Sequence, residues 1–133
     1  MKKTLVTTAF ALVVLFASFT NAQTSRLYFS DKEILNLVEG IKSNNLGLKR
    51  CSIYLAAKYQ VVETVPAMVA EFKNEINPQN KVLIALALYQ IGDESGIKAV
   101  YNASLSDENP KVRKTCFEVM NYFKNAENVV SNE

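Results

Sequence analysis

The residues with most chemical potential are two cysteines and two pairs of adjacent acids. Cys51 and Cys116 could act as nucleophiles or form a disulfide. The pairs Asp93-Glu94 and Asp107-Glu108 offer the two carboxylates that glycoside hydrolysis uses. Both pairs stand where a helix is expected to begin, and negative charge there complements the positive end of the helix dipole. We therefore interpret the acids as helix-start residues.

Groups that would activate a nucleophile are missing. The chain has no His, which excludes Ser-His-Asp and Cys-His catalysis and every metal site that uses His. Ser95, in the segment "GDESG", lacks the flanking glycines of a nucleophile elbow. We predict a turn between two helices there, and a non-enzymatic protein without catalytic residues, cofactor or metal.

The N-terminal segment is typical of a secretory signal peptide, residues 1–22. Lys2 and Lys3 precede an apolar stretch from Leu5 to Phe19, and Ala22 stands where a signal peptidase would cut. The stretch is shorter than the about 20 apolar residues of a membrane span, and an uncleaved anchor is the alternative. We expect a periplasmic or secreted protein with no membrane association after cleavage.

Without the signal peptide the chain has a net charge near zero. The full chain contains 15 basic and 13 acidic residues, and removal of the signal peptide also removes Lys2 and Lys3. No basic patch for DNA or RNA remains, so we expect no nucleic-acid partner. The remaining length suits a single domain with one core.

An internal repeat organises this domain. A shift of 32 residues aligns Asn45, Asn77 and Asn109, and Pro follows the last two. Asn is a favoured N-cap and Pro suits the first helical position, so a helix is expected to start at each. Apolar residues align at the same shift, as in Ile53, Ala85 and Phe117 or in Ala56, Leu88 and Met120.

A second series of helices lies between these starts. Apolar stripes with helical spacing run over residues 34–41, 65–72 and 97–105. We predict an all-α fold of six helices in three antiparallel hairpins. Their expected ranges are 31–43, 47–60, 64–74, 79–91, 94–105 and 110–124, with an extended lead-in at 23–30 and a polar tail at 125–133.

The apolar run from Val82 to Tyr89 belongs to the middle of this stack. We expect helices on both sides to bury it nearly all round. Asp at Ala85 or Leu86 should therefore unfold the domain, whereas Asp at Lys114 should not.

These motifs resemble the HEAT repeat, in particular the short bacterial form called the phycobilisome-lyase HEAT-like repeat. In that family an Asp precedes a helix with a Val-Arg pair, as do Asp107, Val112 and Arg113 here. The helix ends in Ile-Gly-Asp, like residues 91–93. The resemblance covers residues 31–124 and implies a short right-handed α-solenoid with a 32-residue period.

The resemblance also implies a ladder of hydrogen bonds between acids and bases along the stack. Carried over, Glu75 would pair with Lys81, and Asp107 with Arg113, with Lys49 at the corresponding place in the first repeat. Such pairs would set the register between hairpins. Ser43 stands where the first acid is expected.

The two cysteines lie two repeats apart. Packed helices are separated by about 8–10 Å, whereas a disulfide needs α-carbons within about 7 Å. We predict free thiols, with Cys116 buried and Cys51 nearer an edge.

The leading functional hypothesis is a small exported scaffold or adaptor that binds another protein, because solenoids form extended concave surfaces. The second-series helices would offer a binding surface at Asn36, Glu39, Ala67, Ala70, Glu71, Lys98 and Asn102. Two alternatives stand beside it. One is an enzyme, since some HEAT-like proteins of the lyase family act on bilins, and the other is an accessory fragment of a larger repeat assembly.

The C-terminal end of the stack is expected to be apolar. The following tail is short and polar, and the last helix carries the apolar residues Phe117, Val119, Met120, Tyr122 and Phe123. Terminal repeats normally need a polar outer face. This end therefore either folds residues 129–130 back as a cap or associates with another chain, including a second copy.

Overall fold

Asparagine side chains start three of the helices, as the spacing predicts. The computed structural model describes the backbone of residues 28–130 and the side chains of residues 28–122. Helices α3 (Leu46–Lys58), α5 (Pro78–Ile91) and α7 (Pro110–Val130) follow Asn45, Asn77 and Asn109. Each asparagine Oδ1 accepts first-turn backbone N–H groups at 2.9 to 3.3 Å. These bonds satisfy donors that the helix itself leaves unpaired.

The other three helices start differently. In α2 (Asp31–Ile41) a capping box joins Ser30 and Glu33, and hydrogen bonds from the Ser30 hydroxyl and N–H lower the pKa of Glu33. A 3₁₀ turn, η2 (Val62–Thr64), leads into α4 (Val65–Asn74), and Asp93 caps α6 (Glu94–Ser106). The prediction of six helices is confirmed, and residues 28–130 contain no strand.

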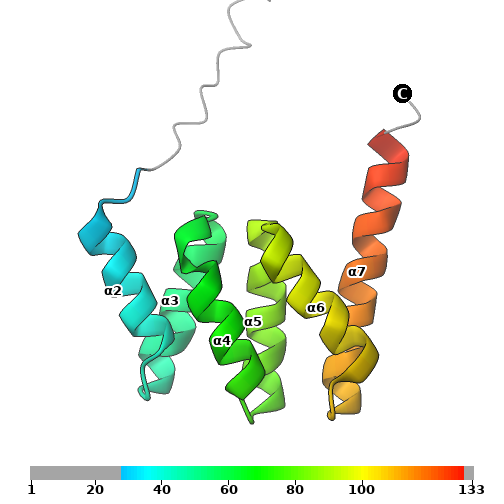
Figure 1. Ribbon diagram of the computed structural model, residues 1–133, viewed down its shortest axis with the longest axis horizontal. Coiled ribbons are helices and arrows are strands. Elements are labelled where there is room, and N and C mark those ends of the chain that lie inside the picture. Colours follow the sequence, from blue (N-terminus) through cyan, green and yellow to red (C-terminus); the bar gives the residue numbers. More distant parts are fainter. Residues whose placement is uncertain (1–27, 131–133) are drawn as a thin grey trace, which may run out of the picture.

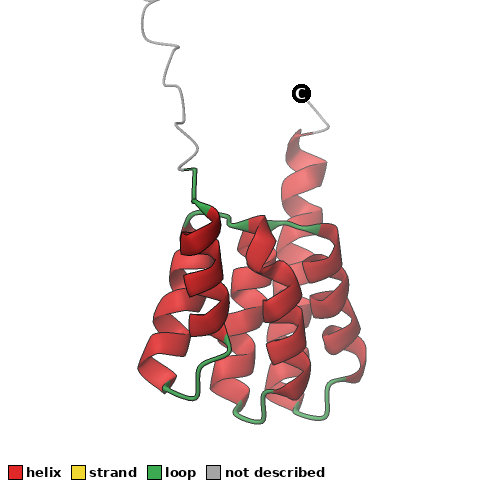
Figure 2. Ribbon diagram, turned by 60° about the vertical axis from the view of Figure 1, so that its left-hand side comes forward, coloured by secondary structure: helices red, strands yellow, loops and turns green. Residues whose placement is uncertain are grey.

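The helices stand in two rows. α3, α5 and α7 form one row, and α2, α4 and α6 form the other (Figures 1 and 2). Neighbours within each row are in contact, and α2 with α3, α4 with α5 and α6 with α7 pack as pairs across the rows. Helices α3 and α5 therefore each touch their own partner and the next helix of the same row, and α5 also touches α6.

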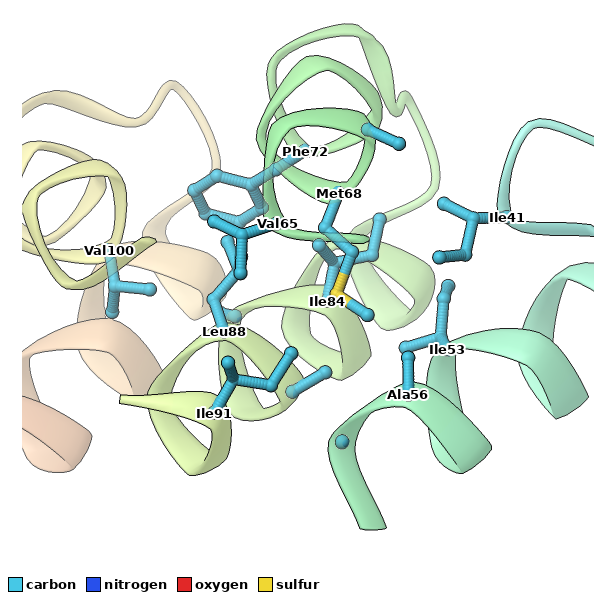
Figure 3. Close-up of a cluster of buried hydrophobic side chains, with 14 of the residues drawn as sticks. Ile41, Ile53, Ala56, Val65, Met68, Phe72, Ile84, Leu88, Ile91 and Val100 are labelled. Carbon is cyan, nitrogen blue, oxygen red and sulfur yellow. The ribbon is translucent and has the colours of Figure 1, made fainter. Parts of the chain in front are cut away.

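The core lies between the rows. Ile41 of α2, Ile53 of α3 and Met68 of α4 come together with Ile84 and Leu88 of α5 (Figure 3), and all five side chains are fully buried. Burial of a side chain of this size contributes about 1.5 to 3 kcal/mol. Because residues from four helices meet here, the pairs cannot separate without exposing this cluster.

The apolar run of α5 is buried less completely than predicted. Ile84, Ala85 and Leu88 have no exposed surface, but Leu86 is 43% exposed. The expectation that Leu86 is buried is therefore wrong, and its replacement by Asp loses the reason for which it was expected to unfold the protein. Helix α5 contacts α3 and α7 within its row and α4 and α6 across it, and Leu86 lies on the part of its surface that these helices leave uncovered.

Helix α7 is longer than predicted. It continues past 124 to Val130, so the expected polar tail at 125–133 is helical for most of its length. Residues 125–130 contain neither Gly nor Pro, and nothing local stops the helix. Figure 1 shows this part running straight on beyond the other helices, so the backbone does not fold back as a cap.

The predicted signal peptide, 1–22, and most of the lead-in fall outside the described residues. Residues 28–30 are non-helical, and the Phe29 ring packs on that of Tyr59 with centroids 5.6 Å apart. None of the helices in the described part of the chain has both the length and the hydropathy of a membrane span.

Replacement of Ala85 and Leu86 by Asp gives a matched test of this packing. Ala85→Asp places an unpaired charge among fully buried side chains and should unfold the protein. Leu86→Asp, one residue away in the same helix, should change the free energy of unfolding by less than about 1 kcal/mol. Urea unfolding followed by circular dichroism measures both, and equal stability of the two variants would contradict the packing.

Candidate protein-binding groove

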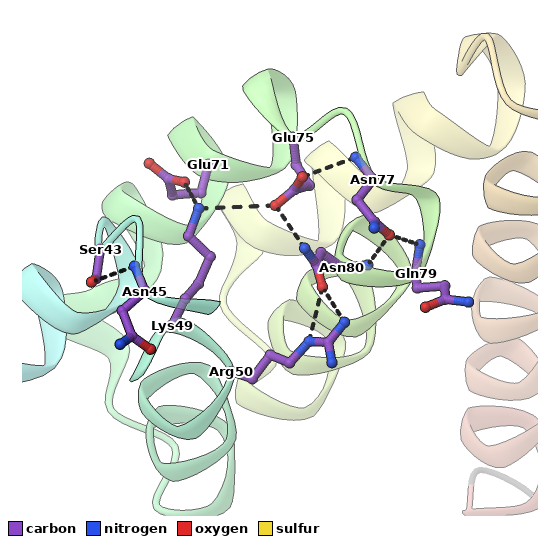
Figure 4. Close-up of polar contacts among 9 residues, drawn as sticks. All are labelled: Ser43, Asn45, Lys49, Arg50, Glu71, Glu75, Asn77, Gln79 and Asn80. Atoms are coloured by element: carbon purple, nitrogen blue, oxygen red, sulfur yellow. Dashed lines mark hydrogen bonds and ion pairs between the residues drawn. The ribbon is translucent and has the colours of Figure 1, made fainter. Parts of the chain in front are cut away.

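One carboxylate joins three elements at the start of α5. Glu75 Oε1 accepts the Asn77 N–H at 2.9 Å, and its Oε2 accepts a 3.3 Å hydrogen bond from the side chain of Asn80 (Figure 4). The Lys49 ammonium of α3 lies 3.9 Å from the same carboxylate and forms a 2.8 Å ion pair with Glu71 of α4. Glu75 thus supports the helix cap and ties α5 to the preceding pair.

The same arrangement occurs at the start of α7. Asp107 accepts the Asn109 N–H at 2.9 Å and forms a 2.6 Å ion pair with Lys81 of α5. The Asp107 side chain is only 6% exposed, and the Lys81 ammonium also lies 5.8 Å from the centre of the Phe72 ring. Ser43 makes the corresponding bond to the Asn45 N–H at 3.0 Å.

The ladder residues are in contact, but not as the predicted pairs. The predicted pairs of Glu75 with Lys81 and of Asp107 with Arg113 are wrong. Glu75 instead lies near Lys49 of α3, and Asp107 pairs with Lys81 of α5. The acid lies in the loop before its helix, where it faces back along the row. Arg113 instead donates to the backbone carbonyls of Asp107 and Glu108, at 2.5 and 3.1 Å.

A buried asparagine in this network escaped the sequence reasoning. Asn80 Oδ1 accepts from Arg50 Nε at 3.0 Å and from a terminal Arg50 nitrogen at 2.8 Å (Figure 4). Leu48 and Val112 stand 32 residues to either side of Asn80. When the chain is aligned with itself at a shift of 32 residues, a polar residue therefore stands where both equivalent positions are apolar. This difference indicates a buried polar contact, because buried polar groups form hydrogen bonds.

An open groove lies above this ladder, between α4 and α6. Its volume is about 510 Å³, and Glu75, Lys81 and Asp107 form part of its lining. Ala99, Asn102 and Ala103 of α6 line it on one side, and Asn74 and Ile76 on the other. The Ile76 side chain is 93% exposed. The groove therefore combines ion-paired side chains, three asparagines (Asn74, Asn102 and Asn109) and an almost fully exposed apolar side chain.

The predicted binding surface is only partly present. Of the seven residues, Asn36, Glu39, Ala70, Lys98 and Asn102 are exposed. Ala67 is buried, so the expectation that it would admit a partner is wrong. It faces the core because α4 packs on both α2 and α6. Glu71 is partly buried and forms an ion pair with Lys49. Asn102 is the one predicted residue that lines the groove.

The residues with chemical potential have structural roles. Asp93 accepts the Ser95 N–H and hydroxyl, and the hydroxyl bond is the main cause of the lowered pKa of Asp93. Ser95 is thus part of the α6 start. Among the side chains that the structure describes, residues 28–122, no group of three or more His, Cys, Asp or Glu could hold a metal ion.

The cysteines are placed as predicted. Both are free, with Cys51 exposed and Cys116 buried. Burial, and then the neighbouring Asp107 charge, raise the pKa of Cys116 to about 11. The thiol of Cys116 therefore stays protonated at neutral pH.

No family model, curated protein or solved structure matches the chain.

The two thiols should differ in reactivity. Cys51 should react with a maleimide or disulfide reagent at neutral pH in the folded protein, whereas Cys116 should react only after unfolding. The reactivity of Cys116 should stay low as the pH rises through 9, the usual value, because its own pKa lies near 11. Mass spectrometry before and after denaturation counts the adducts, and Cys51→Ala provides the control. Two rapid adducts on the native protein would contradict the buried position of Cys116.

Proposed function

We propose that this chain is a small exported helical-repeat scaffold of the HEAT-like type that binds another protein and performs no catalysis. In this proposal the signal peptide 1–22 directs it to the periplasm or the exterior. The helices form a short right-handed α-solenoid with a 32-residue period. The recurrence of Ser43, Glu75 and Asp107 as acceptors for the three capping asparagines supports the repeat.

The observation that carries the binding role is the groove between α4 and α6. Ile76 stands almost wholly in solvent at its rim, although burial of such a side chain is favourable by roughly 1.5 to 3 kcal/mol. A partner that covers Ile76 would gain this energy.

The shape and polarity of the groove favour an extended segment of the partner. The amides of Asn74 and Asn102 each carry a donor and an acceptor, which match the N–H and C=O groups of a peptide backbone. The small Ala99 and Ala103 leave room for an apolar side chain of the partner between these amides and Ile76. The carboxylates of Glu75 and Asp107 are paired with lysines, and Lys73 and Glu108 of the lining have opposite charges, so the groove offers little net charge to a partner.

Site-specific photo-crosslinking in cells tests this proposal. A photoreactive amino acid at Ile76 or Asn102 should trap the same partner protein, whereas one at Leu86, on the outer side of α5, should not. Ile76→Asp and Asn102→Arg should each weaken capture at least about tenfold, in line with the loss of an interface anchor. Leu86→Asp, which removes an exposed apolar side chain of similar size, is the matched control. Equal trapping from all three positions, or capture unaffected by both variants, would contradict the groove as the binding site.

A further inference from the structure

The two ends of the stack carry exposed apolar residues whose counterparts inside the stack are buried. Ile41 and Ile53 have no exposed surface, because α4 and α5 cover them. Phe117, two periods after Ile53 and one after the buried Ala85, is 55% exposed. Leu105, two periods after Ile41, is 63% exposed, and the exposed Lys73 stands between them in the middle pair. Leu105 and Phe117 present the side of α6 and α7 against which a further pair of helices would pack.

The other end presents the complementary side. Ala67 of α4 and Asn80 of α5 are buried, and Asn80 bonds to Arg50 of α3. Their counterparts one period earlier are Leu35 and Leu48, which are 58% and 51% exposed. The α2/α3 end thus exposes the side on which a preceding pair of helices would pack. The α6/α7 end exposes the side on which a following pair would pack.

The charges of the two ends also complement each other. Lys49 binds Glu71 at 2.8 Å, and the counterparts of these two residues at the ends are Arg113 and Glu39. Glu39 is exposed and forms no ion pair with any side chain of residues 28–122. Arg113 likewise has no carboxylate partner in the described part of the chain and bonds only to backbone carbonyls.

We propose that the α6/α7 end of one copy binds the α2/α3 end of a second copy, in the register that joins consecutive pairs within the chain. Arg113 of the first copy then faces Glu39 of the second, as Lys49 faces Glu71. Leu105 and Phe117 pack near Leu35 and Leu48. The contact is head-to-tail, so each copy has both halves and the assembly grows into open chains. The groove between α4 and α6 takes no part in this contact.

Charge reversal and sedimentation velocity test the pairing. The purified protein should form oligomers that lengthen with concentration and shorten with added salt. Glu39→Arg and Arg113→Glu should each lower the association constant at least about tenfold, because like charges then face each other. Lys98→Glu, an exposed charge reversal outside the contact, should associate like the unaltered protein.

Mixing the two variants distinguishes head-to-tail contact from a two-fold contact between identical ends. In the mixture, the arginine introduced at position 39 of one variant meets the glutamate introduced at position 113 of the other. The unaltered residues also meet, so association should return. Glu39→Arg disrupts no ion pair within the described residues, and thermal unfolding checks that both variants fold. A strictly monomeric protein, normal association of Glu39→Arg, or no recovery in the mixture would overturn the proposal. So would a photo-crosslinker at Phe117 that traps only a different protein.

Discussion

A carboxylate placed two residues before a capping asparagine connects the starts of α5 and α7 to the helix that precedes each of them in its row. Glu75 and Asp107 each accept a hydrogen bond from the backbone N–H of the asparagine two residues later. Each also forms an ion pair with a lysine of the preceding helix in the row, α3 or α5. The cap needs the acceptor to form a regular helix start. The lysine then fixes where that start lies against the helix before it. One side chain therefore couples local helix geometry to the spacing of the row.

The surroundings strengthen this contact. The side chains of Lys81 and Asp107 are largely buried, and such a pair loses much more than a surface pair when one partner is removed. The Phe72 ring lies beside the Lys81 ammonium and is itself a buried residue of the core. At the first junction the polar link is extended through Asn80 to Arg50. The two junctions thus share the carboxylate but differ in what supports it.

Local signals predicted the helices well, because capping asparagines act on the residues next to them. Helix α7 was predicted too short, since polar composition does not stop a helix that lacks Gly or Pro. The ladder residues were found from their spacing, but spacing shows which positions are equivalent and not which loops face each other. For the same reason Ala67 was placed on the surface and Leu86 in the core. Ile76, in a loop between two helices, carries no periodic signal at all.

A double-mutant cycle on Lys81 and Asp107 tests most directly whether the ladder sets the register. Asp107→Asn retains an acceptor for the Asn109 N–H and removes the charge, and Lys81→Met retains most of the side-chain volume. Urea unfolding of the two single variants, the double variant and the unaltered protein gives the coupling free energy. The account predicts a favourable coupling of about 1 to 3 kcal/mol, above the range of exposed ion pairs. A coupling near zero, with both single variants as stable as the unaltered protein, would contradict it.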